Sequence, residues 1–439
     1  MIFGASNEFF YYNYSREATF ELNLIIKLKE ELNLDAFKTS VSKALRNYPE
    51  LSYRLKLENN VLVAESNDLP VAFYPESGKT YYYCSKQTNG HSIFFTYDKY
   101  SVTLNMFHGW TDFNGFSRFL RTVFWYYAEE TGFAFSDEEK AELLPLIRTE
   151  APDLSAVDAG DFFDPYRKYQ NSSSVPAEPE PQAPLFAIPY EPYEDEAGFA
   201  STYTIELSTS AFLAETKRTN VSFVPLMVDI FSSAVFKAYE TGNAPIGTMV
   251  PVDLRPLFGS DTSVNFSDGV FIRYYPEDTL LPQTERCAKL KERMLAYKNR
   301  EFFENVILQK VRAVDAFRQD PRPLAEAAAE RRKPKKPGTP GPFTYALSYP
   351  GKITFTSGPD RMIEDIFFKP LCRVPSIIAY TFRDSMRLYV MWRTDDTTFP
   401  EAILDEFRSR GFEAEYVDIS RRYVNYFDVE ELPDDKQRV

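Results

Sequence analysis

One histidine stands in a sequence context in which it could act as a base. The segment runs Met106-Phe107-His108-Gly109-Trp110-Thr111-Asp112-Phe113-Asn114-Gly115-Phe116, with an aspartate four residues after the histidine. Imidazole is the side chain that accepts a proton most readily near neutral pH. Transfer of an acyl group to a hydroxyl or amine needs such a base, held in one orientation by a carboxylate that acts directly or by fixing the loop. His108 and Asp112 are therefore candidate catalytic residues.

Other interpretations fit the same short segment. Asp112 is also a good helix N-cap, and His108 could be an interior histidine whose hydrogen bonds are satisfied. Trp110 could line a substrate channel, or it could anchor the loop by packing on a neighbouring lobe. The spacing alone does not choose between these interpretations.

The elements on either side of the loop are predicted by hydrophobic periodicity. Val102, Leu104 and Met106 point to one side of an extended chain, and His108 shares their parity. If the strand continues that far, His108 faces the same interior side. A helix should follow, because one apolar stripe contains Phe116, Phe119, Leu120, Val123, Phe124 and Tyr127.

The first half of the chain otherwise alternates strands and helices. The pattern predicts a strand over about 20–28, a helix after Asn33 that ends at Pro49, and a strand over 51–57. Strands should dominate 79–107, with Asn89-Gly90 as a hairpin turn.

The second half shows a similar alternation. We expect a strand over 202–207, helices to 217 and over 224–239, and a strand over 247–254. Helical periodicity covers 283–317, strands fall in 345–356 and 377–393, and the last helix runs from Phe399 to Arg410, ending at Gly411.

A weak internal repeat relates the two halves. Helix, proline and strand follow one another in 37–54 and again in 226–255, and strand, polar loop and helix occur in 102–123 and again in 386–407. The second copy has Arg393-Thr394-Asp395-Asp396 where the first has the histidine. A chain of 439 residues also exceeds the usual size of one core. We therefore expect an N-terminal lobe over 1–165, a linker rich in proline and acid over 166–198, and a C-terminal lobe over 199–439.

Charge and cysteine content exclude several classes of function. The net charge is −14, which disfavours nucleic acid as the main partner. The basic run Arg331, Arg332, Lys333, Lys335 and Lys336 is read as a solvated loop, with a docking patch for a phosphate-bearing ligand or acidic carrier as the alternative. Three distant cysteines and two histidines predict neither a disulfide framework nor a zinc site.

The location is predicted from what the sequence lacks. No apolar run approaches 18 residues, so no transmembrane segment is expected, and the N-terminus does not resemble a secretory signal. We expect a cytoplasmic monomer.

Four segments together resemble the coenzyme A-dependent acyltransferase superfamily, which includes chloramphenicol acetyltransferase and the condensation domains of peptide synthetases. Leu34 to Leu51 looks like its opening helix and following strand, and His108-x-x-x-Asp112 matches its active-site signature. The segments 251–258 and 344–353 are similar to segments of bacterial alcohol acetyltransferase-like members. Their order and spacing are more specific than any single motif.

The resemblance implies an α/β fold of two chloramphenicol acetyltransferase-like lobes, each a mixed sheet with helices, and an active-site tunnel between them. His108 would be the general base, and Asp112 a structural brace paired with Arg255. Ser348 would hydrogen-bond the oxyanion or substrate, or else be a strand-end turn residue. The implied reaction moves an acetyl or short acyl group from acyl-CoA, the co-substrate, to a small-molecule alcohol or amine, with no tightly bound cofactor.

The sequence departs from the family at three points. Phe107 replaces a frequent second histidine, and Phe113 replaces the usual glycine after the aspartate, with Gly115 two residues later. A phenylalanine there could narrow or reshape the tunnel. The segment Asn265-Phe266-Ser267-Asp268-Gly269 stands where plant members carry Asp-Phe-Gly-Trp-Gly.

Two alternatives to the CoA-dependent enzyme stay open. The donor could be an acyl or peptidyl group on the phosphopantetheine of a separate carrier protein. The chain could also be a non-catalytic binding protein on the same fold.

Overall fold

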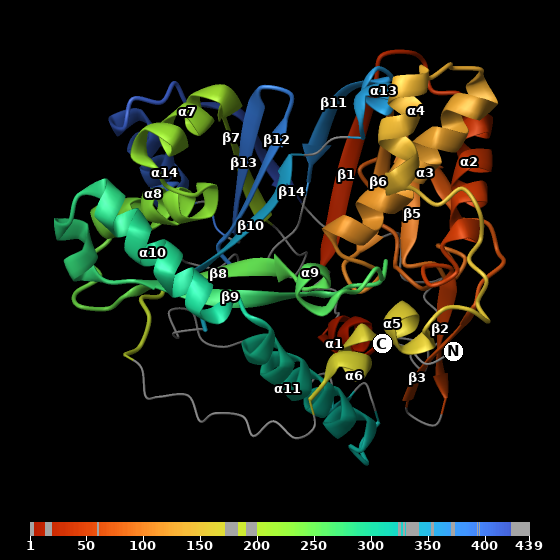
Figure 1. Ribbon diagram of the computed structural model, residues 1–439, viewed down its shortest axis with the longest axis horizontal. Helices are drawn as coiled ribbons and strands as arrows, with labels where there is room; N and C mark the ends of the chain where they lie inside the picture. The colour runs from red at the N-terminus through yellow and green to blue at the C-terminus, as the bar shows by residue number, and fades with distance from the viewer. Residues whose placement is uncertain are drawn as a thin grey trace.

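The structure is a computed structural model, and two β-sheets form its framework, side by side in Figure 1. It describes residues 4–13, 20–58, 61–171, 183–189, 200–323, 326–327, 330, 342–352, 355–369, 374–392, 394 and 396–422. The molecule is α/β, with each sheet covered by helices, which confirms the predicted fold class of two lobes.

The first sheet carries the strand that leads to His108. Its strand order is β11-β1-β6-β5-β4, and only the β4–β5 pair is parallel. The strands are β1 (Glu21–Leu28), β4 (Phe73–Pro75), β5 (Ile93–Tyr97), β6 (Ser101–Phe107) and β11 (Ile363–Phe368). A separate hairpin pairs β2 (Tyr53–Glu58) with β3 (Val61–Ser66).

The second sheet is larger and also mixed. Its order is β14-β7-β13-β12-β10-β8-β9, with β10 parallel to both β12 and β8. The strands are β7 (Ala200–Ser208), β8 (Ile246–Asp253), β9 (Ser267–Tyr274), β10 (Tyr345–Lys352), β12 (Ser376–Phe382), β13 (Ser385–Trp392) and β14 (Glu415–Arg422).

Helices cover one face of each sheet. In the first lobe, α2 (Leu34–Asn47) and α3 (Phe113–Thr131) pack together on β1 and β6 around one buried core. In the second, α8 (Phe223–Ala238) and α14 (Thr398–Ser409) pack together within the other core, and α10 (Gln283–Tyr297) contacts α8 and β9.

The remaining helices are shorter or lie between the lobes. Figure 1 shows α1 (Ala5–Asn13) below the two sheets, beside α6 (Pro165–Tyr169) and α11 (Arg300–Arg318), and these three helices contact one another. The others are α4 (Asp137–Leu143), η1 (Leu144–Leu146), α5 (Ala159–Phe163), α7 (Thr209–Thr219), α9 (Arg255–Phe258), η2 (Pro276–Leu280) and α13 (Ser357–Asp360).

Most elements fall where the periodicity placed them. Asn33 caps α2 by accepting a hydrogen bond from the Ala36 amide at 3.1 Å, and α14 ends before Gly411, whose φ is +85°. Ser208 caps α7 by accepting a hydrogen bond from the Ala211 amide at 3.1 Å.

Other expectations were wrong in detail. Residues 81–92 form turns and loop rather than a strand, and 377–393 holds the hairpin β12–β13 rather than one strand. Asn89 and Gly90 both have positive φ, as a tight turn requires, but this turn does not join two strands. Strand β6 ends at Phe107, so strand parity does not determine the direction of His108.

One strand of the first sheet comes from the C-terminal half of the chain. Strand β11, from the C-terminal half, pairs antiparallel with β1 in the first sheet, with Leu24 opposite Phe368. The sequence did not predict this strand. The division at 165 and 198 stays a prediction.

Within the described ranges, no single helix has the length and apolar content needed to cross a membrane; α7 and α8 meet that criterion only as a pair bent by 98°. No group of three or more His, Cys, Asp or Glu side chains in the same ranges could hold a metal ion. The basic run at 331–336 lies outside the described residues.

A capping substitution tests the start of α2. Asn33→Ala should lower the free energy of unfolding by about 1 kcal/mol, because the Ala36 amide loses its acceptor. Ser42→Ala, at an exposed position of the same helix, should change it by less than about 0.5 kcal/mol. Urea denaturation measures both, and equal effects would contradict the cap.

Candidate active site

The loop that carries His108 joins β6 to α3 and is anchored in the first core. The His108 amide donates to the Phe20 carbonyl at 2.8 Å, and the Trp110 amide donates back to Phe107 at 2.8 Å. Trp110 is 1% exposed, donates from Nε1 to the Leu51 carbonyl at 2.7 Å, and packs edge-on against Phe119. Trp110 therefore anchors the loop, and its anchor lies in its own lobe rather than on the neighbouring one.

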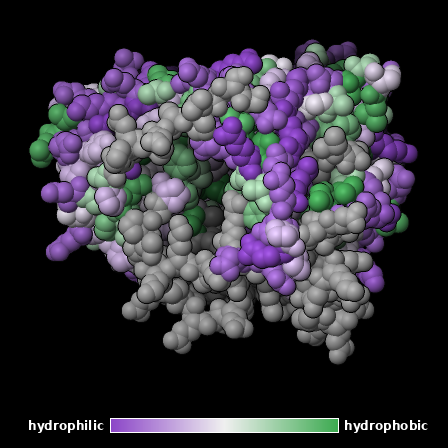
Figure 2. All heavy atoms as spheres, turned by 90° about the horizontal axis from the view of Figure 1, so that it is seen from below, coloured by the Kyte–Doolittle hydropathy of each residue, from purple (hydrophilic) through white to green (hydrophobic). Residues whose placement is uncertain are grey.

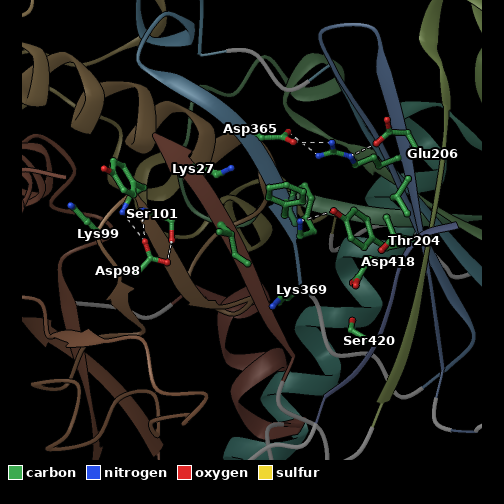
Figure 3. Close-up of a pocket in the computed structure, with 17 residues that line it drawn as sticks. Lys27, Asp98, Lys99, Ser101, Thr204, Glu206, Asp365, Lys369, Asp418 and Ser420 are labelled. Carbon is green, nitrogen blue, oxygen red and sulfur yellow. Dashed lines mark hydrogen bonds and ion pairs between the residues drawn. The ribbon is translucent and has the colours of Figure 1, made fainter. Parts of the chain in front are cut away.

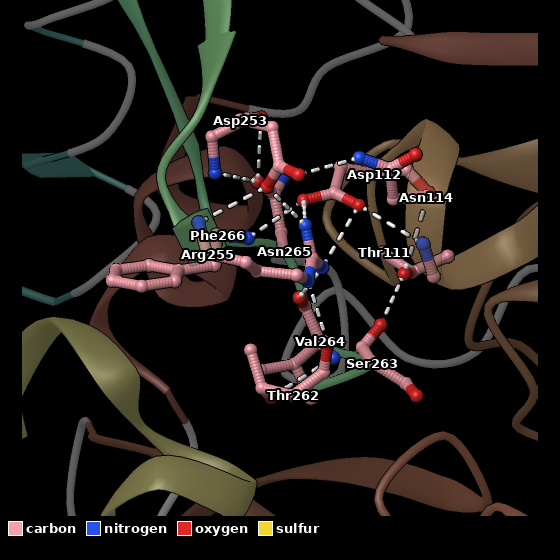
Figure 4. A network of polar contacts seen from close by, with 12 residues as sticks. Thr111, Asp112, Asn114, Asp253, Arg255, Thr262, Ser263, Val264, Asn265 and Phe266 are labelled. Atoms are coloured by element: carbon pink, nitrogen blue, oxygen red, sulfur yellow. Dashed lines mark hydrogen bonds and ion pairs between the residues drawn. The ribbon is translucent and has the colours of Figure 1, made fainter. Parts of the chain in front are cut away.

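Asp112 caps α3 and at the same time binds the second lobe. Its Oδ1 accepts from the Gly115 amide at 3.1 Å, the bond of an N-cap. Arg255 donates from Nη1 to Oδ2 at 2.9 Å and from Nη2 to Oδ1 at 3.0 Å, and the Phe266 amide donates to Oδ2 at 2.8 Å. Figure 4 shows the carboxylate between these donors. These four contacts fix Asp112 to the loop and to the opposite lobe.

Arg255 uses every N–H of its guanidinium at this contact. Besides Asp112, Nη1 donates to Asp253 at 2.8 Å, Nη2 to the Val264 carbonyl at 2.8 Å, and Nε to the Thr262 carbonyl at 2.7 Å. Five donors in a planar fork meet five acceptors, an arrangement that a lysine could not reproduce. Burial opposes the charge of Arg255, but the carboxylates of Asp112 and Asp253 outweigh it and raise its pKa.

The chain of 262–266 lies directly on the start of α3. The Thr111 hydroxyl donates to the Ser263 carbonyl, and Asn114 donates from Nδ2 to Asp253 at 2.8 Å. A Cβ at Gly115 would overlap the Thr111 hydroxyl and the Ser263 carbonyl oxygen. Gly115 is thus required by the close approach of the two lobes.

Phe113 is the first residue of α3 and is half-buried. Its ring packs edge-on to that of Phe116, with centroids 4.9 Å apart, at the margin of the first core. The Phe113 side chain, which stands where the family usually has glycine, therefore packs partly against its own helix.

The imidazole of His108 lies between an aromatic ring and an amide. The ring of Phe10 stacks on it at a centroid distance of 4.8 Å and an interplanar angle of 10°. Asn265, from the second lobe, places Nδ2 at 3.2 Å from the His108 carbonyl, to which it donates, and at 3.3 Å from Nδ1. The ring is thus contacted from two separate parts of the chain.

The surroundings of His108 favour its neutral form. Burial lowers its pKa below the usual 6.5, while its own carbonyl, the Asp112 carboxylate and the Thr111 carbonyl oppose that shift. An imidazole that is neutral at pH 7 can accept a proton.

Ser348 lies on β10, opposite Ile378 of β12, where the register between the two strands shifts. It is half-buried. Among the described residues, no hydrogen bond joins Ser348 to His108, so its role stays a prediction.

Two contacts of the site were not predicted. Asn265 lies in the segment 265–269, which stands where plant members carry Asp-Phe-Gly-Trp-Gly. This correspondence is the one signal in the sequence that could have indicated its contact with His108. Phe10 lies on α1, almost a hundred residues before His108, and no local pattern connects the two.

A separate cleft of about 930 Å³ opens between the two sheets. Figure 3 shows strands of both lobes around it, with Lys27 and Asp365 on one side and Thr204 and Glu206 on the other. Ser101, at the start of β6, lines this cleft, whereas His108 follows the end of β6, roughly 20 Å away along the strand. His108 is not among its lining residues, and a tunnel to His108 stays a prediction.

The face seen from below is hollowed near its middle. Figure 2 shows hydrophobic residues within this hollow. This is the side on which Figure 1 shows α1 and α11.

The fold is shared with solved acyltransferase structures. The TRI101 structure from F. sporotrichioides, complexed with coenzyme A and T-2, has a TM-score of 0.57 at 10% identity, covering 93% of this chain and 98% of that one. The trichothecene 15-O-acetyltransferase TRI3 from Fusarium sporotrichioides has 0.57 at 12% identity, covering 92% and 94%. The epimerization domain of the third module of tyrocidine synthetase B has 0.59 at 11% identity, covering 93% and 94%. Neither a protein-family model nor a curated protein sequence matches the chain.

Removal of one charge from the interlobe pair tests its contribution. Asp112→Asn should lower the free energy of unfolding by about 3–5 kcal/mol, because it leaves the buried Arg255 without its main counter-ion. Asp253→Asn, at the more exposed partner, should cost about 1 kcal/mol or less. Denaturant unfolding followed by circular dichroism compares the two, and an Asp112→Asn protein as stable as Asp253→Asn would refute the brace.

Proposed function

We propose that this chain is an acyltransferase that moves an acyl group from acyl-CoA to a small-molecule alcohol or amine, with His108 as general base. One observation carries the proposal: a half-buried imidazole, biased to its neutral form, stands on a loop that the Asp112–Arg255 pair locks between two lobes. The shared fold supports the class of reaction, since structures of that fold include a named acetyltransferase and one complexed with coenzyme A.

The proton movements follow from the contacts of the imidazole. We assign the proton of the neutral imidazole to Nδ1, with the carbonyl of His108 itself as its acceptor, which leaves Nε2 basic. In this tautomer the Asn265 amide donates to the His108 carbonyl and not to Nδ1. Nε2 removes the proton from the acceptor as its oxygen or nitrogen attacks the thioester carbonyl. The tetrahedral intermediate then expels the CoA thiolate, which takes the same proton from the imidazolium, so no acyl-enzyme forms.

Asp112 has a structural role in this mechanism. Both of its oxygens accept hydrogen bonds from Arg255, and the Gly115 and Phe266 amides occupy its other sites. It therefore holds the loop and adds a favourable field for the imidazolium, without receiving the proton.

Ser348 is our candidate donor to the oxyanion or substrate, because it lies on the second-lobe strand expected to face the base. Phe113 is a candidate for the substrate channel, from its half-buried place next to Asp112.

A carrier-bound donor is the second candidate. It is favoured by the shared fold of the tyrocidine synthetase epimerization domain, which belongs to a modular synthetase. Parallel assays with acetyl-CoA and with an acylated carrier protein as acyl donor decide between the two.

We also propose that the protein is a monomer and that it is located in the cytoplasm.

Replacement of the base tests the reaction directly. His108→Gln should reduce acetyl transfer to a panel of alcohols and amines by at least about 100-fold, because the general base is lost. His91→Gln is the matched control, since His91 is buried and contacts the Leu69 carbonyl through Nε2 at 2.7 Å, away from the loop. Equal turnover by His108→Gln and the wild type would remove the catalytic role.

The pH dependence tests the protonation state. Because burial lowers the pKa of His108 below 6.5 and the base must be neutral, kcat/KM should stay level down to about pH 6.5 and fall at lower pH. Asn265→Asp places a carboxylate beside Nδ1, which stabilises the imidazolium and should move the acidic limb up by about one pH unit. Asn220→Asp, the same change at an exposed side chain at the end of α7, should leave the limb in place. An acidic limb unmoved by Asn265→Asp would contradict His108 as the titrating group.

A further inference from the structure

Asp112 cannot set the orientation of the imidazole. Its two oxygens already accept four hydrogen bonds, two of them from Arg255. Four acceptances fill the lone-pair sites of a carboxylate. The orientation of the base must come from other contacts.

The ring of Phe10 stacks on the face of the imidazole. The two rings are nearly parallel, at 10°, with centroids 4.8 Å apart, and Phe10 also meets Phe20 edge-on at 5.7 Å. A parallel stack restricts rotation of the imidazole about its Cβ–Cγ bond, because turning the ring would press it into its neighbour. The contact leaves the ring edge, where the nitrogens lie, unblocked by Phe10.

Helix α1 holds the loop as well as the ring. Asn7 donates from Nδ2 to the Gly109 carbonyl at 2.6 Å and to the Trp110 carbonyl at 3.2 Å, directly after His108. A Cβ at Gly109 would press on the Phe107 ring and lie 3.1 Å from Cβ of Phe10. Glycine at this position lets α1 approach the loop.

Helix α1 is itself fixed to other elements. Glu8 is fully buried and accepts from Arg318 of α11 at 2.7 and 3.1 Å, and Tyr12 stacks on Phe317 at 4.7 Å. The Ala5 amide donates to Asp164, before α6, at 3.1 Å. A helix held at three points can present one ring in a constant position.

We infer that Phe10 is a positioning residue for the base: its stacked ring, delivered by α1, holds the His108 imidazole in one orientation, with Nδ1 toward the Asn265 side chain and Nε2 available. The kinetic part of this inference rests on the proposed function. The structural part does not, because it concerns the imidazole in the protein without substrate.

The chain offers a direct readout, since it contains only two histidines. Imidazole proton resonances of His108 and His91 can be followed by NMR in the full chain, with His108→Gln assigning the signals. Phe10→Leu removes the ring but keeps an apolar side chain of similar size. Phe73→Leu is the matched control, because it removes a parallel ring stack, that of Phe73 on Phe95 in the first core, and Phe73 lies on β4 rather than on α1.

In Phe10→Leu we expect the His108 resonances to move downfield, as the ring current of Phe10 is lost, while those of His91 stay in place. We expect kcat to fall about 10- to 100-fold with a smaller change in KM, since the base is misplaced and binding is not. Phe10→Tyr should restore most of kcat, and Phe73→Leu should leave both the His108 resonances and kcat near the wild type.

Three results would overturn the inference: unchanged His108 resonances in Phe10→Leu, an unchanged kcat in an enzyme that depends on His108, or the same losses in Phe73→Leu. A wild type with no His108-dependent turnover would instead refute the proposed function, and the resonances would still report whether Phe10 holds the ring.

Discussion

The buried ion pair between Asp112 and Arg255 joins the histidine loop to the second lobe. Both side chains are about 5% exposed, so neither charge has water to compensate for the loss of the other. The pair also gathers the 262–266 chain, because Arg255 binds the Thr262 and Val264 carbonyls while Asp112 binds the Phe266 amide. The desolvation of the two charges offsets much of what such a buried pair adds to the free energy of unfolding. Its main effect here is to fix the position of the loop that carries His108 relative to the second lobe.

The parts of the site that could be predicted are those with local sequence signals. Strand β6, the cap of α3 by Asp112 and the helix behind it follow from periodicity and capping chemistry. Arg255 came from a resemblance over a short strand, and the structure places it against Asp112. For Trp110 the sequence allowed either a channel wall or a loop anchor, and the burial of its side chain in the first core favours the anchor.

The parts that could not be predicted depend on contacts distant in sequence. Strand β11 enters the first sheet only by pairing with β1, about 340 residues earlier, and its own pattern is short. Phe10 meets His108 because α1 docks on α11, through Glu8 and Arg318, 310 residues apart. In the sequence Gly115 is notable only for its place two residues after Phe113, yet its lack of a side chain makes room for the Ser263 backbone. No periodicity within a segment encodes these approaches.

If His108 is the base, its imidazole must meet the reacting atoms from a fixed position between the lobes. A crystal structure of the protein with an acyl-CoA and an accepted alcohol or amine would show this contact. We expect the acceptor's hydroxyl oxygen or amine nitrogen at about 2.6–3.2 Å from Nε2 of His108, with the Asp112–Arg255 pair intact. A donor and acceptor that meet only in the cleft lined by Lys27, Glu206 and Arg387, out of reach of Nε2, would contradict it.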